Sequence, residues 1–241
     1  MIWYFSATGN SQHVAFRLGG LLDEKVQEIT HETVFQPIGN PFVLVIPNYF
    51  WGMPQIVVDL IKETIFTEED SIHILYTCGG SIGTGDAQAR RLAKPATVYT
   101  HQLVMETSYI LWHEIEAENK RIEKLMAADR EIPIIAQRIR EGRGTYQSSP
   151  ILVPLGWLFE RIYQHQRRTH SFFVTKSCIG CGNCANKCPD QAIRMESERP
   201  KWIQRQCQHC LRCLHRCPKG AIEYGKSTIG RERYTYPGSM G

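Results

Sequence analysis

Eight of the nine cysteines in this 241-residue chain lie in two short runs near its end. Each run has the spacing Cys-x-x-Cys-x-x-Cys-x-x-x-Cys-Pro, and the second run, from Cys207, begins 29 residues after the first, from Cys178. Three thiolates at this spacing wrap one face of a cuboidal iron–sulfur cluster, and the fourth, followed by proline, reaches the other cluster. The pattern therefore predicts two [4Fe–4S] clusters.

Each cluster is expected to take three cysteines from one run and the last cysteine of the other. The ligands predicted for one cluster are Cys178, Cys181, Cys184 and Cys217. The ligands predicted for the other are Cys207, Cys210, Cys213 and Cys188. Zinc is the alternative, but zinc sites usually show two separated Cys-x-x-Cys pairs and four ligands in all. Because cysteine supplies all eight ligands, we expect His209 and His215 to be surface residues.

A second group of chemically suited residues is the hexapeptide Ser6-Ala7-Thr8-Gly9-Asn10-Ser11. It stands between a strand-like run and a helix-like segment, and such a strand–loop–helix presents backbone N–H groups to an anion. The hexapeptide has no lysine and only one glycine, so it is neither of the common glycine-rich nucleotide loops. Its hydroxyl groups predict a phosphate monoester held by neutral donors. The simpler alternative is a serine helix cap, which would explain Ser11 alone.

Two further loops follow strand-like segments. Residues 47–54 contain three consecutive aromatic residues, and residues 77–85 are rich in glycine. In open α/β sheets, ligands lie outside the carboxyl ends of the strands. Together with the hexapeptide, these loops predict a site for a flat, phosphorylated ligand on which aromatic rings could stack.

The elements that would position these loops alternate along the first 105 residues. The strand-like segments are 2–5, 42–46, 72–76 and 102–105. The helix-like segments are 11–22, 54–63 and 86–93. Strands that alternate with helices predict a parallel sheet covered by helices on both faces.

The middle of the chain carries less specific patterns. Residues 114–141 read as one long charged helix, which Pro133 should kink or divide. Residues 142–150 read as a linker. Residues 151–168 form an amphipathic pattern, which we interpret as a helix packed between two domains rather than one lying on a membrane.

Composition limits the classes of protein to consider. With 42% hydrophobic and 22% charged residues, the chain is globular, and it has no apolar run of 18 residues. The N-terminal residues show no basic segment of a signal peptide, so we expect a cytoplasmic protein whose thiols stay reduced. Residues 1–160 carry 13 Lys and Arg against 19 Asp and Glu, and residues 161–241 carry 15 against 5. A basic end can indicate nucleic acid as a partner, but anionic clusters would offset this charge, so we expect none.

Residues 176–224 resemble a bacterial two-cluster ferredoxin, and residues 1–110 resemble flavodoxins through the Ser/Thr-x-Thr-Gly-Asn-Ser/Thr motif. The resemblance implies FMN as a cofactor. Its phosphate would be held by Ser6, Thr8, Gly9, Asn10 and Ser11. Its isoalloxazine would be flanked by Asn48, Tyr49, Phe50, Trp51 and Gly52. Its pyrimidine edge would be lined by Cys78, Gly79 and Gly80. The third loop lacks the tyrosine that many flavodoxins stack on the ring.

Taken together, the chain is similar to the flavodoxin–ferredoxin fusion family of anaerobes. This resemblance implies an α/β, doubly wound five-stranded parallel sheet followed by a small α+β domain that holds two clusters. The regions expected are 1–145 for the flavin domain, 146–172 for a linker and docking helix, and 173–241 for the ferredoxin domain with a basic aromatic tail. That tail, residues 224–237, would either cover a cluster edge, meet an acidic partner or be solvated.

The function implied is transfer of low-potential electrons between the clusters, FMN and external redox proteins, with a second copy of the chain as a further candidate partner. Two alternatives stay open. One is an FMN-dependent reductase, with Glu106, Tyr109 and His113 as candidate proton donors. The other is an iron–sulfur sensor or binding module. Cys78 is interpreted as a small packing residue rather than a redox-active thiol.

Overall fold

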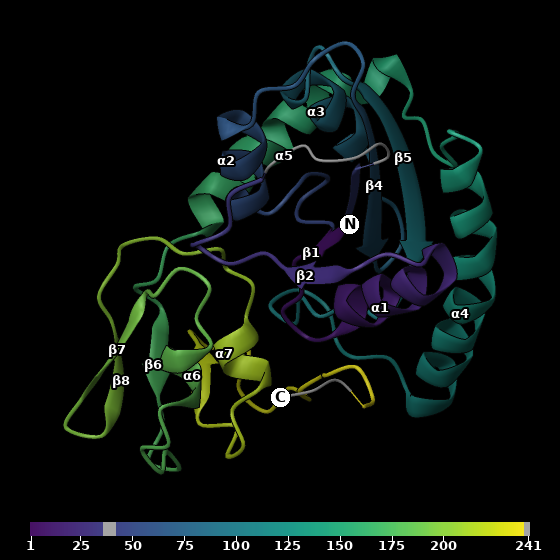
Figure 1. Cartoon of the computed structure of the whole chain (residues 1–241). Coiled ribbons are helices and arrows are strands. Elements are labelled where there is room, and N and C mark those ends of the chain that lie inside the picture. Colours follow the sequence, from purple (N-terminus) through teal and green to yellow (C-terminus); the bar gives the residue numbers. More distant parts are fainter. Residues whose placement is uncertain (36–41, 239–241) are drawn as a thin grey trace. The chain divides into compact units, whose positions relative to one another are not determined.

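The computed structural model describes residues 1–35 and 42–238 (Figure 1). Contacts between residues divide the chain into two compact units. The first, which we call the sheet unit, comprises Met1–Ser6, Asn10–Glu106 and Glu118–Gln164. The second, the cysteine unit, comprises Ala7–Gly9, Thr107–Ala117 and His165–Gly241. The units interleave along the sequence, and each is described by itself below.

Five strands among the described residues form the parallel sheet of the sheet unit, in the order β2-β1-β3-β4-β5. Their bounds are Ile2–Tyr4 (β1), Val26–Glu28 (β2), Phe42–Pro47 (β3), Ser71–Cys78 (β4) and Thr97–Val104 (β5). This order is that of flavodoxin-like doubly wound sheets, in which the strand order reverses between β1 and β3. The predicted fold class of this part is confirmed.

Helices cover both faces of the sheet. They are α1 (Asn10–Leu22), α2 (Gln55–Glu63), α3 (Gly85–Leu92), α4 (Glu118–Arg140) and α5 (Val153–Gln166), the last preceded by the 3-10 turn η1 (Pro150–Leu152). Helix α1 packs against α4 and α2 against α3, and Figure 1 shows these pairs on opposite sides of the sheet. The central strands are therefore buried on both faces, which explains why residues 42–46 are continuously apolar.

Several local predictions need correction. Strand β2 was not expected, and β5 begins at Thr97 rather than at residue 102. Helix α4 begins at Glu118, and Pro133 lies inside it without dividing it. Buried side chains along one face of α4 hold its turns on both sides of the proline, so packing outweighs the lost backbone hydrogen bond.

Residues 142–150, predicted as a linker, run along the sheet unit. The backbone N–H groups of Thr145 and Tyr146 both donate to Thr100 O, at 2.9 and 3.0 Å. Further on, Ser148 N donates to Asp86 Oδ2 at 2.9 Å. The segment that leads into α5 is thus hydrogen-bonded to the sheet and to α3.

The cysteine unit has smaller elements. Strand β6 (Phe172–Val174) pairs antiparallel with β9 (Ile222–Tyr224), and β7 (Ile193–Glu196) pairs antiparallel with β8 (Arg199–Trp202). Two four-residue helices, α6 (Asn183–Asn186) and α7 (Arg212–His215), lie within the two cysteine runs. One buried hydrophobic cluster of the unit consists of Ile110, Leu111, Phe172, Leu211, Leu214 and Ile222. This small α+β arrangement is ferredoxin-like, as predicted.

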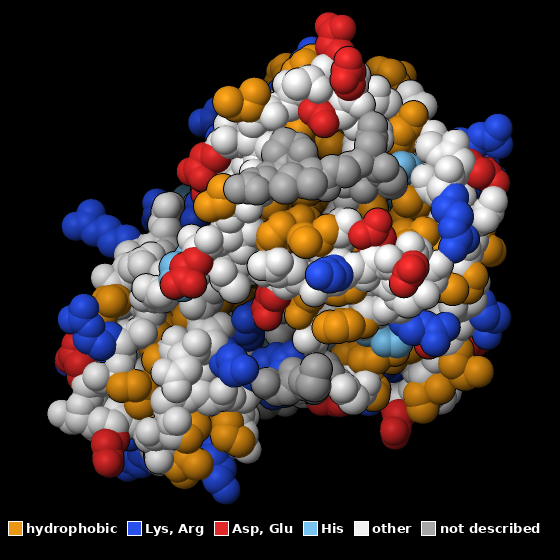
Figure 2. All heavy atoms as spheres, viewed as in Figure 1, with side chains coloured by type: hydrophobic (Ala, Val, Ile, Leu, Met, Phe, Trp, Pro, Cys, Tyr) orange, Lys and Arg blue, Asp and Glu red, His pale blue; other side chains and the backbone are white. Residues whose placement is uncertain are grey.

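The surface mixes side-chain types. Figure 2 shows hydrophobic, basic and acidic side chains interleaved on one face of the molecule. Within residues 1–35 and 42–238, no helix combines the length and apolar character that crossing a membrane requires.

Candidate functional site

The cysteines of the two runs line two pockets in the cysteine unit. One pocket is lined by Cys178, Cys181, Cys184 and Cys217, together with apolar side chains from β7, β8 and β9. The other is lined by Cys188, Cys207, Cys210 and Cys213, together with Phe172, Trp202 and Leu211. The structure therefore brings together three cysteines of one run and the last cysteine of the other in each pocket. These are the two sets that the spacing predicts, and ligation itself stays a prediction.

The 29-residue repeat extends from the sequence to the backbone. Gly182 and Leu211, which are 29 positions apart, both adopt the left-handed conformation, with φ of 74° and 59°, directly before α6 and α7. Glycine takes this conformation freely, whereas a side chain makes it unfavourable. Leu211 nevertheless holds it because its side chain is buried in the core of the unit. The two runs therefore wind in the same way around their pockets.

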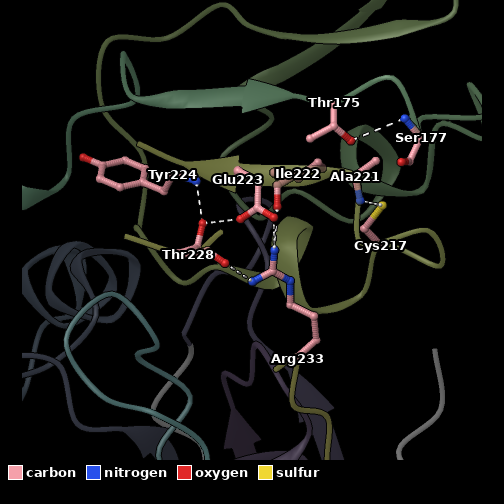
Figure 3. A network of polar contacts seen from close by, with 9 residues as sticks. All are labelled: Thr175, Ser177, Cys217, Ala221, Ile222, Glu223, Tyr224, Thr228 and Arg233. Carbon is pink, nitrogen blue, oxygen red and sulfur yellow. Dashed lines mark hydrogen bonds and ion pairs between the residues drawn. The ribbon is translucent and has the colours of Figure 1, made fainter. Parts of the chain in front are cut away.

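Backbone amides point at the last sulfur atom of each run. Ala192 N donates to Cys188 Sγ and Ala221 N donates to Cys217 Sγ, each at 3.3 Å (Figure 3 shows the second). Hydrogen bonds of this kind stabilise negative charge on sulfur. The turn from each of these cysteines to the alanine four residues later thus prepares the sulfur to act as a thiolate ligand.

Burial makes uncompensated thiolates unfavourable in both pockets. It raises the pKa of Cys184 to about 11 and that of Cys210 to about 12. It also raises the pKa of Cys207 and Cys213. Buried thiolates need a positive partner, and bound iron would supply one. The donor set of four cysteines in each pocket fits a [4Fe–4S] cluster. Among the residues that the structure describes, no three His, Cys, Asp or Glu side chains are arranged to hold a single metal ion.

The prediction that His209 and His215 lie on the surface is wrong. Their side chains are buried, at 2% and 5% exposure. His215 Nε2 lies 2.7 Å from Ser108 O, and its Nδ1 accepts from Tyr234 N at 3.1 Å. Burial lowers the pKa of both histidines to about 4, so both are neutral at pH 7. His215 therefore connects the segment 107–117 and the C-terminal tail to α7.

His209 lies in an aromatic environment. Its ring meets those of Phe172 and Tyr224 edge-on, at centroid distances of 5.7 and 4.8 Å. The hydroxyl of Tyr109 lies 3.3 Å from His209 Nδ1. His209 Nε2 is buried and has no hydrogen-bond partner in the part of the chain that the structure describes. The histidine is a packed interior residue beside the second pocket.

The basic tail is packed at some positions and exposed at others: Thr228 and Tyr234 are buried, at 0% and 3% exposure, whereas Ile229 is 58% exposed. Figure 3 shows its anchor, a network centred on Arg233. Arg233 forms an ion pair with Glu223 at 2.8 Å, and its guanidinium also donates to the carbonyls of Ile222 and Thr228, each at 3.2 Å. The tail is thereby bound to β9, which follows Cys217 by five residues.

The predicted phosphate hexapeptide is divided between the units. Ser6, Asn10 and Ser11 belong to the sheet unit, where Asn10 Nδ2 donates to Glu106 O at 2.9 Å. The hydroxyl groups of Ser11 and Thr77 are 2.8 Å apart. Residues 7–9 belong to the cysteine unit. All six residues of the hexapeptide are buried.

The aromatic loop after β3 turns sharply. Tyr49 and Gly52 exchange two backbone hydrogen bonds of 2.8 and 2.9 Å, with Phe50 and Trp51 at positive φ between them. Asn48 Nδ2 donates to Ser81 O at 3.2 Å, which joins this loop to the glycine loop. Asn48 Oδ1 is buried without a hydrogen-bond partner among the described residues. An N–H or O–H donor of a bound ligand would satisfy it.

The rings of this loop pack on α5, a contribution that the sequence analysis did not identify. Phe50 stacks on Tyr163 at a centroid distance of 5.8 Å, and Trp51 lies 4.5 Å from Phe159. Tyr163 and Phe159 are four residues apart and so share one face of the helix. Phe159 belongs to the amphipathic pattern of residues 151–168. The local sequence of that pattern does not indicate that its apolar face packs on the aromatic loop after β3.

In the glycine loop after β4, Gly79 and Gly80 are exposed and Cys78 is buried. Cys78 Sγ lies 3.4 Å from Gly80 O, and burial raises its pKa to about 11, so it is a thiol at pH 7. Of the candidate proton donors, Glu106 lies in the sheet unit, whereas Tyr109 and His113 lie in the cysteine unit.

Comparisons with known proteins give one family match and one similar solved structure. A family model described as a 4Fe-4S dicluster domain matches residues 177–221. No curated protein matches the chain. Among solved structures, the azoreductase from Bacillus anthracis str. Sterne is similar over 57% of this chain and 98% of its own, with 11% sequence identity and a TM-score of 0.37. The segment that lines both cysteine pockets is therefore similar to a 4Fe-4S dicluster domain, which confirms the iron–sulfur part of the prediction.

Proposed function

We propose that this chain is an electron-transfer protein that passes low-potential electrons between two [4Fe–4S] clusters, FMN and external redox proteins. The observation that carries the proposal is the pair of four-cysteine pockets, each with its last cysteine from the other run. All eight cysteines of the pockets lie within the segment that matches the dicluster domain.

The residues of each pocket have separate tasks. The thiolates would bind iron, and the amide hydrogen bonds to Cys188 and Cys217 would stabilise charge on two of the ligands. Apolar side chains such as Phe172 and Trp202 would keep water away from the cluster, which influences its reduction potential. When bound, each cluster would exchange one electron, and FMN would exchange one or two.

The proposal of FMN is supported by the fold and by the loops at one sheet edge. The strand order is that of flavodoxin-like sheets, whose ligands lie outside the carboxyl ends of the strands. The loops that follow β1, β3 and β4 all leave that edge. The first is rich in hydroxyl groups and has no cation, and the second holds the unsatisfied Asn48 Oδ1. Hydroxyl and amide groups suit a phosphate, and Asn48 suits a donor on the rest of the ligand.

Helix α5 would then have a role at the flavin. Phe50 and Trp51 are held by Tyr163 and Phe159, so their rings have fixed orientations before any ligand binds. Preorganised aromatic residues bind a flat ring with a smaller loss of conformational entropy.

The first test is the composition of protein purified under anaerobic conditions. We expect about eight iron and about eight sulfide per chain, with FMN as the extracted flavin. Zinc in place of iron would overturn the cluster assignment. Absence of flavin, together with failure to bind added FMN, would overturn the FMN assignment and leave the clusters standing.

The second test separates phosphate binding from ring binding. Thr8→Val removes a hydroxyl and nearly keeps the side-chain volume. A hydrogen bond to a charged group contributes about 1.5–3 kcal/mol, so FMN affinity should fall about tenfold to a hundredfold. Riboflavin has no phosphate, and its affinity should not change. Equal weakening of both ligands would show that Thr8 shapes the loop and does not contact phosphate.

A further inference from the structure

The carbonyl groups of the loop Ala7–Gly9 are held by residues from the far end of the sequence. Arg216 Nε donates to Ala7 O at 3.0 Å, and Tyr236 N donates to Thr8 O at 2.7 Å. All of these residues belong to the cysteine unit. Two consecutive carbonyls of the predicted phosphate loop therefore take their orientation from residues that are more than 200 positions away in the chain.

Holding these carbonyls also orients the amides of the loop. In a trans peptide the C=O group and the following N–H point in opposite directions. Fixing Ala7 O and Thr8 O thus turns the N–H groups of Thr8 and Gly9 away from Arg216 and Tyr236. Gly9 has a φ of 106°, which only glycine adopts readily. Successive N–H groups that point to the same side can form an anion-binding cradle.

Arg216 is tied to the first cysteine pocket. It directly precedes Cys217, and its carbonyl accepts from Asn183 Nδ2 at 3.1 Å. Asn183 directly precedes Cys184, and all of these residues except Arg216 line that pocket. A change in how Cys184 and Cys217 are held therefore moves the residue that holds Ala7.

Tyr236 is tied to the same part of the unit through the tail. Two residues before it, the backbone N–H of Tyr234 donates to His215 Nδ1. Three residues before it, Arg233 is bound to Glu223 and to Ile222 O, as Figure 3 shows. The tail thus follows the segment between Cys213 and β9.

We propose that Arg216 and the backbone of Tyr236 are positioning residues for the flavin phosphate, so that FMN binding depends on the cysteine unit being folded around its clusters. The inference rests on the proposed FMN site. Because coupling between two sites is reciprocal, bound FMN would in turn protect the cluster ligated by Cys217 from loss.

The first experiment titrates the cluster-loaded, full-length protein with FMN and, separately, with riboflavin, following flavin fluorescence. Arg216→Gln should weaken FMN binding about tenfold and leave riboflavin binding unchanged. Arg231→Gln is the matched control, because Arg231 also donates from its guanidinium to a backbone carbonyl of this unit, His113 O, at 2.8 Å. It removes the same charge and one hydrogen bond, and FMN affinity should stay within about twofold of wild type. Iron content, measured for each variant, should stay at the wild-type level.

The second experiment removes a single N–H group without changing charge. Tyr236→Pro lacks the backbone donor to Thr8 O, whereas Tyr236→Ala keeps it. Tyr236→Pro should bind FMN about tenfold more weakly than Tyr236→Ala. The two variants should bind riboflavin equally well. Position 236 lies 19 residues after the last cysteine, so this pair also tests the proposal if Arg216→Gln fails to load clusters.

The outcomes separate the two proposals. If wild-type protein binds riboflavin and FMN equally, or binds neither, the phosphate site and this inference both fail. If wild-type protein prefers FMN but the Pro and Ala variants at position 236 bind it equally well, the site stands and the positioning role falls. The role also falls if the affinity for riboflavin declines as much as that for FMN.

Discussion

In the sheet unit, β3 and β4 are buried along nearly their whole length, and helices cover both of their faces. In the cysteine unit, the longest strands among the described residues have four residues, and the buried cluster around Phe172 has six side chains. The first unit can fold by removing apolar surface from water. The second has too little apolar surface for its size, so we infer that bonds to iron provide a large part of its stability.

This difference means that similar damage should have different effects in the two units. Loss of metal should affect one unit and leave the other intact. Truncation of a buried side chain in the core of the sheet unit should destabilise that unit and leave the cysteine unit intact. The following predictions run from the largest expected effect to the smallest.

Removing iron should unfold the cysteine unit. After chelation under reducing conditions, we expect amide hydrogen exchange in residues 172–174 and 222–224 to become fast, while residues 42–47 and 71–78 stay protected. Hydrogen-exchange mass spectrometry of the loaded and chelated protein measures this. Slow exchange in both units after complete iron loss would show that the apolar core of the cysteine unit suffices.

Breaking one ligand should remove one cluster. In Cys188→Ser, we expect loss of the cluster in the pocket with Cys207, Cys210 and Cys213, and therefore about half of the iron. Cys217→Ser is the matched variant, and it should remove the cluster in the other pocket. Iron analysis and electron paramagnetic resonance of the reduced variants check this. If each variant instead lost the cluster of its own run, the exchange of the fourth ligand would be absent.

A cavity in the parallel sheet should destabilise the sheet unit alone. Leu44 is fully buried in β3, opposite Ile74 of β4. Leu44→Ala should lower the free energy of unfolding by about 2–5 kcal/mol, measured in urea by far-ultraviolet circular dichroism. Iron content should not change. Ile65→Ala, at a side chain that is 86% exposed, is the control and should cost less than about 0.5 kcal/mol.

The smallest expected changes in stability come from alanine substitutions at two helical glycines of the sheet unit, and these changes should have opposite signs. At Gly156 in α5, an added Cβ would lie 2.1 Å from Thr84 Oγ1, so Gly156→Ala should destabilise by about 1–3 kcal/mol. At Gly20 in α1, an added Cβ would meet nothing within 4 Å. Gly20→Ala should therefore stabilise by about 0.5–1 kcal/mol through helix propensity. Thermal unfolding curves of both variants measure the sign of each change, and a Gly156→Ala variant that is as stable as wild type or more so would contradict the close packing of α5.

The sequence predicts best where the signal is local. The cysteine spacing identifies both sets of residues that meet in the pockets, because each run supplies the fourth cysteine for the pocket of the other run. The apolar run at 42–46 identifies β3, because a strand buried on both faces needs no alternation. Strand β2 escaped prediction, since its three residues are polar or partly exposed and its pairing partner, β1, lies about 24 residues away.

What the sequence did not predict depends on contacts between distant segments. His209 and His215 are polar residues in a basic run, and their burial follows from Tyr109, Ser108 and Tyr234. Residues 107–117 read as the approach to a long helix, yet they belong to the cysteine unit. A cut at residue 145, the predicted end of the first region, would separate Ile110 and Leu111 from the core that they share with Leu214 and Ile222. The boundaries of the domains remain predictions.

The placement of residues 7–9 and 107–117 in the cysteine unit has a consequence for how the protein is made. Chains are synthesised from the N-terminus at about 5–20 residues per second, so roughly 5–20 s pass between the appearance of Leu111 and that of Leu214. During that time the growing sheet unit can already fold on the ribosome, while Ile110 and Leu111 wait for their partners. Cluster insertion must come later still, after Cys217, and the anchor of Thr8 forms only once Tyr236 has emerged. The order of synthesis thus delivers a folded sheet unit first and the loop Ala7–Gly9 in its final shape last.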